Sequence, residues 1–277
     1  MSWKRSISRV VKEFGRSIRT VKVDVFVTSP SGFLSNRTIL ITGGGRGLGF
    51  HIAKKCVMEG ATVVLTGRNQ STLEAAAESL GENAFGLTCD VSDLSSIEGV
   101  FQKAEEFCKS PIDSVVSNAG ISLHEGDFRN VTEAGWDAQM DTNLKGSFFL
   151  CKEFVSYAEH RKLNRGNILV VTSERARRAD DIPYGLTKVA SDSFVRAMAS
   201  KLIKQGIRVN AIAPGVTCSD MTGRSPDGNL NNDWQNNGRI FLPEEVAEVA
   251  SFLLSDTSAC ISGEVIACNQ GNHIACW

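Results

Sequence analysis

From residue 37 to the end of the chain, short and continuously apolar runs alternate with longer stretches in which apolar residues recur at helical spacing. Continuous apolar runs are typical of strands buried on both faces of a parallel sheet, and the helical spacing is typical of helices that cover such a sheet. The pattern therefore predicts an α/β fold, a doubly wound parallel sheet of the Rossmann type, in a single domain over residues 37–277. The predicted strands are "RTILITGGG", "ATVVLTGR", "NAFGLTCD", "IDSVVSNAG", "GNILVVTS", "IRVNAIAPG" and "GEVIACNQG".

The helices between these strands carry start and stop signals. The helix in "FHIAKKCVMEG" is expected to end at Gly60, and the helix in "PEEVAEVASFLLS" to begin at Pro243, because proline is favoured in the first helical turn. In "STLEAAAESLG", Ser71 is followed three residues later by Glu74, which is the spacing of a capping box. That helix is therefore predicted to begin at Ser71.

Residues 1–36 form an N-terminal extension of different character. Apolar residues recur there at helical spacing and basic residues occupy the other faces, which predicts an amphipathic helix followed by a strand-like segment, "VKVDVFVTSPSG". Three interpretations are open: a helix that packs on its own domain or on a neighbouring subunit, an organelle-targeting peptide, and a membrane-surface helix. We favour the first. The apolar positions are Trp3, Ile7, Val10, Val11, Phe14, Ile18 and Val21.

Composition excludes several classes of protein. With 277 residues, 42% hydrophobic and 22% charged, and a formal net charge of −1, the chain is an ordinary globular one whose overall charge gives no reason to expect nucleic acid or an anionic membrane as partner. Its eight cysteines form no Cys-x-x-Cys pair and have no histidines at ligand spacing, so we expect reduced thiols and no metal site. No run is long enough to cross a bilayer. We expect a cytoplasmic protein, or an organelle-matrix protein if the extension is a targeting peptide.

Glycines cluster where the first predicted strand meets the following helix, in "TGGGRGLG". Glycine lets the backbone turn tightly and approach a pyrophosphate, whose charge is stabilised by the N-terminus of the helix. The alternative is a plain turn, but the position directly after the first strand favours a dinucleotide site. The candidate cofactor-binding residues of this loop are Gly43, Gly45, Arg46, Gly47, Leu48 and Gly49.

The end of the second strand carries information about the cofactor. An acidic residue there would hydrogen-bond the 2′-hydroxyl of NAD, but the sequence runs "VVLTGRN", with Arg68 and Asn69 at that position. Arg46 lies in the glycine loop, and two guanidinium groups can hold a 2′-phosphate through charge-assisted hydrogen bonds. We therefore expect NADP(H) in preference to NAD(H). The competing interpretation is that both arginines are solvated surface charges.

At this point the sequence resembles the short-chain dehydrogenase/reductase family, over residues 37–271. The motifs follow the order of that family: "TGGGRGLG", "CDVSD", "SNAG", "TNLKG", "VVTS", "YGLTK" and "RVNAIAPG". Each motif alone is weak evidence, whereas the full series in order is specific. The glycine spacing is that of the short, single-domain branch. The resemblance implies an NAD(P)-dependent oxidoreductase that acts on CH–OH groups and interconverts a ketone and a secondary alcohol.

The resemblance also implies roles for particular residues. Tyr184 would donate or accept the proton, Ser173 would hold the substrate oxygen, and Asn143 would position a water that relays protons to Lys188. Because residues four apart share one helical face, Lys188 can approach Tyr184, and its ammonium is expected to lower the tyrosine pKa below about 10. Lys188 would also hydrogen-bond the nicotinamide ribose. The remaining cofactor-binding residues that the family implies are Asp90, Val91, Asn118, Ala119, Gly120, Pro214, Gly215, Val216, Thr217 and Ser219.

The segment between the serine and the tyrosine departs from the family pattern. It reads "ERARRADDIP", lacks the usual small residues, and is about two residues shorter, so Thr172 is an alternative to Ser173 as the substrate hydroxyl. Its arginines, Arg175, Arg177 and Arg178, would engage a substrate or form ion pairs with Asp180 and Asp181. We favour the ion pairs.

The substrate and the assembly are open. Residues 219–239 are polar and glycine-rich and fall where the family carries its substrate lid. Candidate substrates are a 3-oxoacyl thioester on a carrier protein, which the resemblance favours, a sugar or other polar ketone, and a hydrophobic ketone. The alternative function is a non-catalytic NADP(H)-binding regulator or scaffold. The resemblance implies a homodimer or homotetramer through the helices after Asn143 and through Tyr184.

Overall fold

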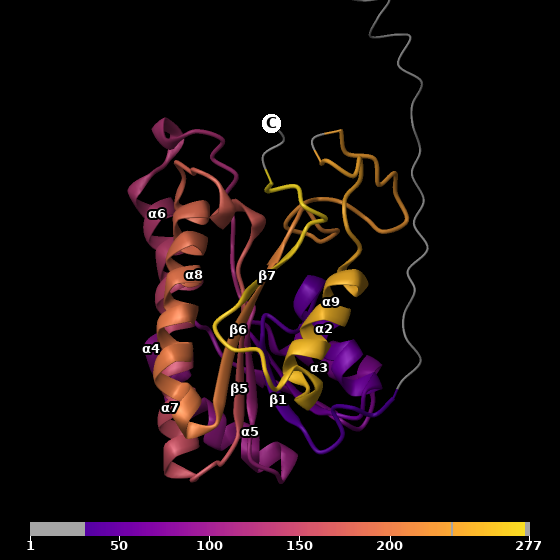
Figure 1. The fold of residues 1–277 in the computed structure, drawn as a ribbon, viewed down its shortest axis with the longest axis vertical. Helices are drawn as coiled ribbons and strands as arrows, with labels where there is room; N and C mark the ends of the chain where they lie inside the picture. Colours follow the sequence, from indigo (N-terminus) through magenta and orange to yellow (C-terminus); the bar gives the residue numbers. More distant parts are fainter. Residues whose placement is uncertain (1–30, 234, 275–277) are drawn as a thin grey trace, which may run out of the picture.

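A seven-stranded parallel sheet forms the centre of the molecule in the computed structural model, which describes residues 31–233 and 235–274. The strand order is β3-β2-β1-β4-β5-β6-β7, and every neighbouring pair is parallel (Figure 1). The predicted doubly wound fold is therefore confirmed. The strands are β1 (Thr38–Thr42), β2 (Thr62–Gly67), β3 (Ala84–Thr88), β4 (Ser114–Ser117), β5 (Gly166–Val171), β6 (Ile207–Pro214) and β7 (Val265–Cys268).

Helices cover both faces of the sheet and build two hydrophobic cores (Figure 1). Along β1 the side chains alternate: Ile39 and Ile41 pack into the core on one face of the sheet, whereas Leu40 packs into the core on the other face. This alternation is why the strand sequences are apolar throughout. One layer contains α2 (Gly47–Met58), α3 (Gln70–Leu80) and α9 (Pro243–Leu254), and the other contains α4 (Leu94–Ile97), α5 (Val100–Cys108), α6 (Glu133–Gln139), α7 (Ser147–His160) and α8 (Pro183–Leu202).

The topology creates a crevice above the middle of the sheet. β1 pairs with β2 on one side and with β4 on the other. The connection that leaves β1 runs through α2 on one face of the sheet, and the connection that leaves β4 runs through α6 and α7 on the other face. Ligands of open α/β sheets bind outside the carboxyl ends of the strands at this kind of switch point. The glycine loop after β1 and the "SNAG" turn after β4 meet there.

The N-terminus of α3 differs from its prediction. Asn69, not Ser71, is the N-cap: its side-chain oxygen accepts the Thr72 backbone N–H at 2.9 Å. The Ser71 hydroxyl donates to the same oxygen at 2.7 Å, and Glu74 accepts from Gln70 on the helix surface. The prediction of a capping box at Ser71 was wrong because asparagine, one of the best N-cap residues, stands two positions earlier.

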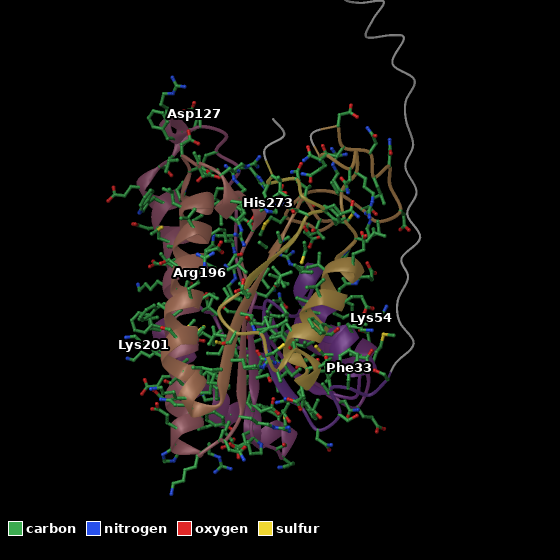
Figure 2. The ribbon with its side chains drawn as sticks, in the orientation of Figure 1. Phe33, Lys54, Asp127, Arg196, Lys201 and His273 are labelled. Carbon is green, nitrogen blue, oxygen red and sulfur yellow. The ribbon has the colours of Figure 1, made fainter. Side chains whose placement is uncertain are left out.

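The predicted amphipathic helix of the extension lies outside the described residues. The described part of the extension packs against the end of α2: Leu34 is fully buried and its backbone N–H donates to the Glu59 carbonyl at 3.0 Å. The Glu59 carboxylate accepts the backbone N–H groups of Ser31 at 3.0 Å and Gly32 at 3.1 Å. Phe33 packs against the core formed by α2, α3 and α9 (Figure 2). Residues 31–36 are thus attached to the domain that follows them.

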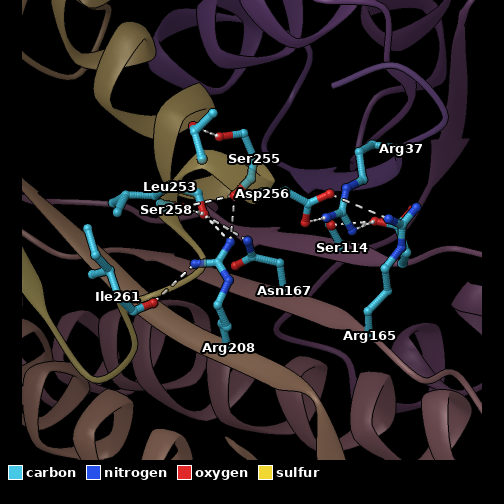
Figure 3. Close-up of polar contacts among 12 residues, drawn as sticks. Arg37, Ser114, Arg165, Asn167, Arg208, Leu253, Ser255, Asp256, Ser258 and Ile261 are labelled. Atoms are coloured by element: carbon cyan, nitrogen blue, oxygen red, sulfur yellow. Dashed lines mark hydrogen bonds and ion pairs between the residues drawn. The ribbon is translucent and has the colours of Figure 1, made fainter. Parts of the chain in front are cut away.

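A polar cluster closes the end of the sheet opposite the crevice (Figure 3). Arg208, at the start of β6, donates through Nη2 to the carbonyls of Leu253 and Ser255, both at 2.9 Å, and through Nη1 to Ile261 at 3.1 Å. Asn167 on β5 donates to the same Leu253 carbonyl at 2.7 Å. These bonds satisfy carbonyls at the C-terminus of α9 that lack helical partners, so α9 is fixed against the sheet.

In the part of the chain that the structure describes, no helix combines the length and the apolar character that crossing a bilayer requires. The seven described cysteines are free thiols. Within the same residues, no three His, Cys, Asp or Glu side chains gather as a metal would need.

Candidate active site

The glycine loop between β1 and α2 adopts a backbone that requires glycine. Gly43 and Gly47 have φ angles of +63° and +56°, which side chains with a Cβ rarely adopt. Gly49 is needed for a different reason, because a Cβ there would overlap the Gly43 carbonyl oxygen and the Asn118 side chain. The first turn of α2 can therefore lie directly against the end of β1.

The "SNAG" turn is tied to this loop through a threonine. Thr42 Oγ1 accepts the backbone N–H groups of Asn118 and Ala119, both at 3.0 Å, and Asn118 Nδ2 donates to the Thr42 carbonyl at 2.8 Å. The Asn118 side chain therefore joins the loops after β1 and β4. Thr42 was not among the predicted site residues; a hydroxyl residue at the end of an apolar strand, directly before the glycines, is the sequence feature that marks it.

A cleft of about 800 Å³ runs along the carboxyl ends of the strands. It is large enough for a dinucleotide-sized ligand. Most of the predicted site residues line it, and so do Thr66, Cys89, Ile121, Thr142 and Met221, which the sequence did not single out. The predicted residues in its wall are Gly43, Gly45, Arg46, Gly47, Leu48, Arg68, Asn69, Asp90, Val91, Asn118, Ala119, Gly120, Ser173, Tyr184, Lys188, Pro214, Gly215, Thr217 and Ser219.

Three predicted residues are not part of the cleft wall. Gly49 lies beneath the glycine loop, and Val216 packs against the small core of Cys218, Leu230, Ile240 and Leu242. Asn143 is buried, where its Oδ1 accepts the Ile121 N–H and its Nδ2 donates to the Ile121 carbonyl, both at 2.8 Å.

Asn143 reaches Ile121 from a local irregularity in the helix. Residues Met140–Gly146 form a π-helical stretch, η2, between α6 and α7. A π-bulge widens the helix by one residue and is frequently found at functional sites. At its end, a Cβ on Gly146 would overlap the Val91 carbonyl oxygen, so this glycine permits close contact with the loop after β3.

Two arginines line the end of the cleft nearest β2. The strand ends at Gly67 and is followed by exposed Arg68 and Asn69, with no acidic residue directly after the strand. Arg46 reaches over from the glycine loop and forms an ion pair with Asp220, Nη1 to Oδ2 at 3.0 Å. The Asn69 side-chain oxygen is used as the α3 cap, and the Asp90 carboxylate accepts from Ser92 at 2.7 Å within its own loop. Two guanidinium groups are therefore the cationic donors at this end.

Ser173 and Tyr184 meet at the other end of the cleft. Ser173 follows β5 and caps the short helix η3 (Glu174–Arg177) by accepting the Arg175 N–H at 3.2 Å, and Tyr184 is the second residue of α8. Burial raises the pKa of Tyr184, while a hydrogen bond from the Ser173 hydroxyl and the Arg175 charge act in the opposite direction. The Thr172 hydroxyl instead donates to the Ile212 carbonyl at 3.1 Å.

Lys188 lies one turn beyond the tyrosine, with Nζ 5.5 Å from the centre of the Tyr184 ring and 2.9 Å from the Val171 carbonyl oxygen. Burial lowers the pKa of Lys188 to about 8, opposed by the negative charge of Asp192 on the next turn of α8. The predicted lowering of the tyrosine pKa by this ammonium is therefore wrong for the structure. Burial is the largest cause for both groups: it raises the pKa of the Tyr184 phenol and lowers that of the Lys188 ammonium.

The charged segment after Ser173 is held by ion pairs and buried hydrogen bonds. Arg175 pairs with Asp180 as predicted, with Nη2 2.7 Å from Oδ1, whereas Arg177 pairs with Asp192 on α8 at 3.8 Å. Asp181 accepts the Phe128 N–H at 3.3 Å, and the predicted pairing of Asp181 with an arginine is not found among the described contacts.

Glu174, which sequence analysis overlooked, is a buried carboxylate that joins three segments. It accepts side-chain amide hydrogens from Gln235 at 3.3 Å and from Asn269 and Asn272 at 3.1 Å each. Gln235 belongs to the polar segment 219–239, and the two asparagines follow β7. His273 continues that C-terminal segment above the sheet (Figure 2). The polar segment is therefore anchored to the residue that follows Ser173.

Comparisons with known proteins agree with this geometry. The chain belongs to the short-chain dehydrogenase/reductase family, because residues 43–273 match the family model described as enoyl-(acyl carrier protein) reductase. It is therefore an NAD(P)-dependent oxidoreductase of the class that acts on CH–OH groups.

Individual relatives extend the comparison over nearly the whole domain. The chain is 34% identical to the 3-oxoacyl-[acyl-carrier-protein] reductase FabG of Chlamydia trachomatis, over 87% of this chain and 99% of that protein. It is 32% identical to the versicolorin reductase stcU of Emericella nidulans, over 86% and 96% of the two chains. The 3-ketoacyl-(acyl-carrier-protein) reductase of Brucella melitensis, solved in complex with NADH, superposes with a TM-score of 0.80 at 26% identity, covering 87% of this chain and all of that one.

Proposed function

We propose that the protein is an NADP(H)-dependent reductase that converts a ketone into a secondary alcohol, with Tyr184 as the proton donor. The observation that carries this proposal is that Ser173, Tyr184 and Lys188 line the same cleft as the glycine loop. A nicotinamide bound in that cleft would supply the hydride. The chain itself must then orient the carbonyl and supply a proton.

The geometry suits an acid at Tyr184. A phenol ordinarily has a pKa of about 10, so Tyr184 holds a proton at neutral pH and can deliver it to the oxygen that becomes an alkoxide. The Ser173 hydroxyl, which contacts the phenol, would hold the same oxygen. Lys188 contributes a buried cation one turn away, and Asn143 holds the loop at Ile121 that forms the adjacent wall.

NADP(H) is the preferred cofactor in this proposal. Arg46 and Arg68 flank the ribose end of the cleft, and no acid follows β2 to bind a 2′-hydroxyl. We expect kcat/KM for NADPH to exceed that for NADH by more than about tenfold, because each charge-assisted hydrogen bond contributes about 1.5–3 kcal/mol. Initial rates with both cofactors test this. Arg68→Ala should lose most of the preference without lowering the efficiency with NADH; an unchanged ratio, or a wild-type preference for NADH, contradicts the assignment.

The proposed substrate is a 3-oxoacyl thioester on a carrier, with a polar ketone as the second candidate. The chlamydial and Brucella relatives are named as reductases of such thioesters, and both match the chain along the whole domain. The polar segment 219–239 borders the cleft through Ser219, Asp220, Met221 and Thr222. Its chemistry favours a substrate with polar groups around the carbonyl.

A homo-oligomer through α7 and α8 is also proposed. Large apolar side chains are exposed on these helices, including Phe148 at 42%, Leu186 at 38% and Val189 at 44%. Phe148 stacks on Phe194 with ring centroids 4.7 Å apart, which extends the apolar surface from one helix to the other. Apolar surface of this kind is typical of an interface between copies. Light scattering of the full chain should give the mass of a dimer or a tetramer, and a monomer would contradict the proposal.

The pH dependence should report the state of Lys188. Its pKa is lowered by burial to about 8, so the ammonium is present below that pH and is lost above it. We expect kcat/KM for NADPH, which reports ionisations of the free enzyme, to fall as the pH rises through about 8. Asp192→Asn removes the anion that raises the lysine pKa, so the fall should move to lower pH. A profile that stays level to pH 10 would contradict this role.

A further inference from the structure

Residues 217–222, which include the start of the polar segment 219–239, lie across the glycine loop. The Arg46 guanidinium pairs with Asp220 at 3.0 Å, and Ser219 approaches Gly47 so closely that a Cβ added there would lie 3.7 Å from the Ser219 Cβ. Arg46 and Asp220 both line the cleft. The cation assigned above to the 2′-phosphate therefore already has an anionic partner from the same chain.

A carboxylate and a phosphate make the same kind of contact with a guanidinium. Both accept charge-assisted hydrogen bonds from the N–H donors of the guanidinium. The two anions therefore compete for the same donors. A 2′-phosphate at Arg46 must therefore displace Asp220 or lie beside a negative charge, and like charges at short range repel. NAD(H), which has a 2′-hydroxyl at this place, meets neither cost.

We propose that Asp220 is a specificity-determining residue, which competes with the 2′-phosphate of NADP(H) for Arg46 and so reduces the preference for NADP(H) over NAD(H). This proposal rests on the assignment of Arg46 to the 2′-phosphate. Under this proposal Asp220 makes no contact with NAD(H), so its carboxylate weakens the binding of NADP(H) and leaves the binding of NAD(H) unchanged.

The segment that carries Asp220 has other attachments, so the carboxylate can be removed without releasing the backbone. The Thr222 hydroxyl donates to the Thr217 carbonyl at 2.8 Å and accepts the Ser219 N–H at 3.1 Å. In addition, His124 Nε2, from the loop after β4, lies 2.8 Å from the Met221 carbonyl oxygen. Asp220→Asn is therefore expected to leave the turn in place.

The size of the effect follows from the exposure of the pair. The Arg46 and Asp220 side chains are 73% and 71% exposed, so water and salt screen their attraction. Exposed pairs of this kind alter equilibria by about two- to fivefold. The expected change is of that size, and it should shrink at high salt.

Two adenosine ligands isolate the 2′-phosphate without any turnover. Adenosine 2′,5′-bisphosphate and AMP differ only in that group, and calorimetric titration of the full-length protein gives a dissociation constant for each. We expect Asp220→Asn to bind the bisphosphate about two- to fivefold more tightly than the wild type and to bind AMP equally well. Asp227→Asn, which removes the same charge from an exposed position further along the loop, is the matched control and should change neither constant.

A second background separates this proposal from the assignment on which it rests. In Arg46→Ala, the bisphosphate should bind more weakly and the added Asp220→Asn should give no further tightening. Equal tightening with and without Arg46, or no tightening in the single variant, overturns the role of Asp220. If the wild type binds the bisphosphate no more tightly than AMP, or if Arg46→Ala leaves its binding unchanged, it is the assignment of Arg46 to the 2′-phosphate that fails.

Discussion

Tyr184→Phe is expected to lower the turnover of ketone reduction by about two to four orders of magnitude, which is the range for loss of a general acid. The substitution removes one oxygen atom and keeps the ring, so the wall of the cleft should keep its shape. NADPH binding should therefore stay close to that of the wild type. Steady-state turnover and a fluorescence titration of NADPH measure the two quantities separately.

The second tyrosine of the chain provides the control. Tyr157 is a buried residue of α7, and its hydroxyl donates to Glu105 at 2.7 Å and accepts the Ile112 N–H at 3.0 Å. Tyr157→Phe also removes one hydroxyl, so it should lower the free energy of unfolding by about 1 kcal/mol and leave turnover unchanged. Near-normal turnover in Tyr184→Phe, or equal losses of turnover in both variants, would exclude Tyr184 as the proton donor.

Gly185→Ala is expected to destabilise the protein by about 3 kcal/mol, although alanine is ordinarily the better helix former. Gly185 is the third residue of α8, and a Cβ there would overlap the Asp180 carboxylate. That carboxylate is 1% exposed and pairs with Arg175. Displacing it separates a buried ion pair and disturbs the helix turn that carries Tyr184. Denaturant unfolding measures the loss, and turnover should fall with it.

The sign of this effect should reverse when Asp180 is removed. In an Asp180→Gly background the space beside Gly185 is free, so Gly185→Ala should raise the free energy of unfolding by about 0.5–1 kcal/mol through helix propensity alone. An equal destabilisation in both backgrounds would mean that the packing of Asp180 against α8 is not the cause.

The fold and the position of the site could be predicted because they depend on local patterns. Apolar runs specify strands buried on both faces, and glycines with positive φ specify the loop after β1. Parallel strands bring their carboxyl ends to one edge, so residues such as Gly43, Asn118 and Ser173 gather in one cleft without any knowledge of their contacts. The order of the sequence motifs then indicated the family and the roles of the individual site residues.

What could not be predicted depends on tertiary packing. The π-helical stretch that directs Asn143 to Ile121 has no sequence signature, and the pKa values of Tyr184 and Lys188 are shifted by burial that only the folded chain creates. Partners distant in sequence were also missed, as with Arg177 and Asp192 or Glu174 and Asn269. The charged segment after Ser173 is therefore best understood as an anchor for the surrounding loops.

The most direct test of the central claim follows the hydride. The full-length protein is incubated with NADPH that carries deuterium at both C4 positions of the nicotinamide and with a 3-oxoacyl thioester, and the product is analysed by mass spectrometry. Catalysis by the proposed route predicts one deuterium on the carbinol carbon of the 3-hydroxyacyl product, formed by the wild type and reduced in proportion to turnover by Tyr184→Phe. Tight binding of NADPH with no deuterated alcohol, from this thioester or from a panel of polar and hydrophobic ketones, would contradict the claim and favour a cofactor-binding protein without turnover.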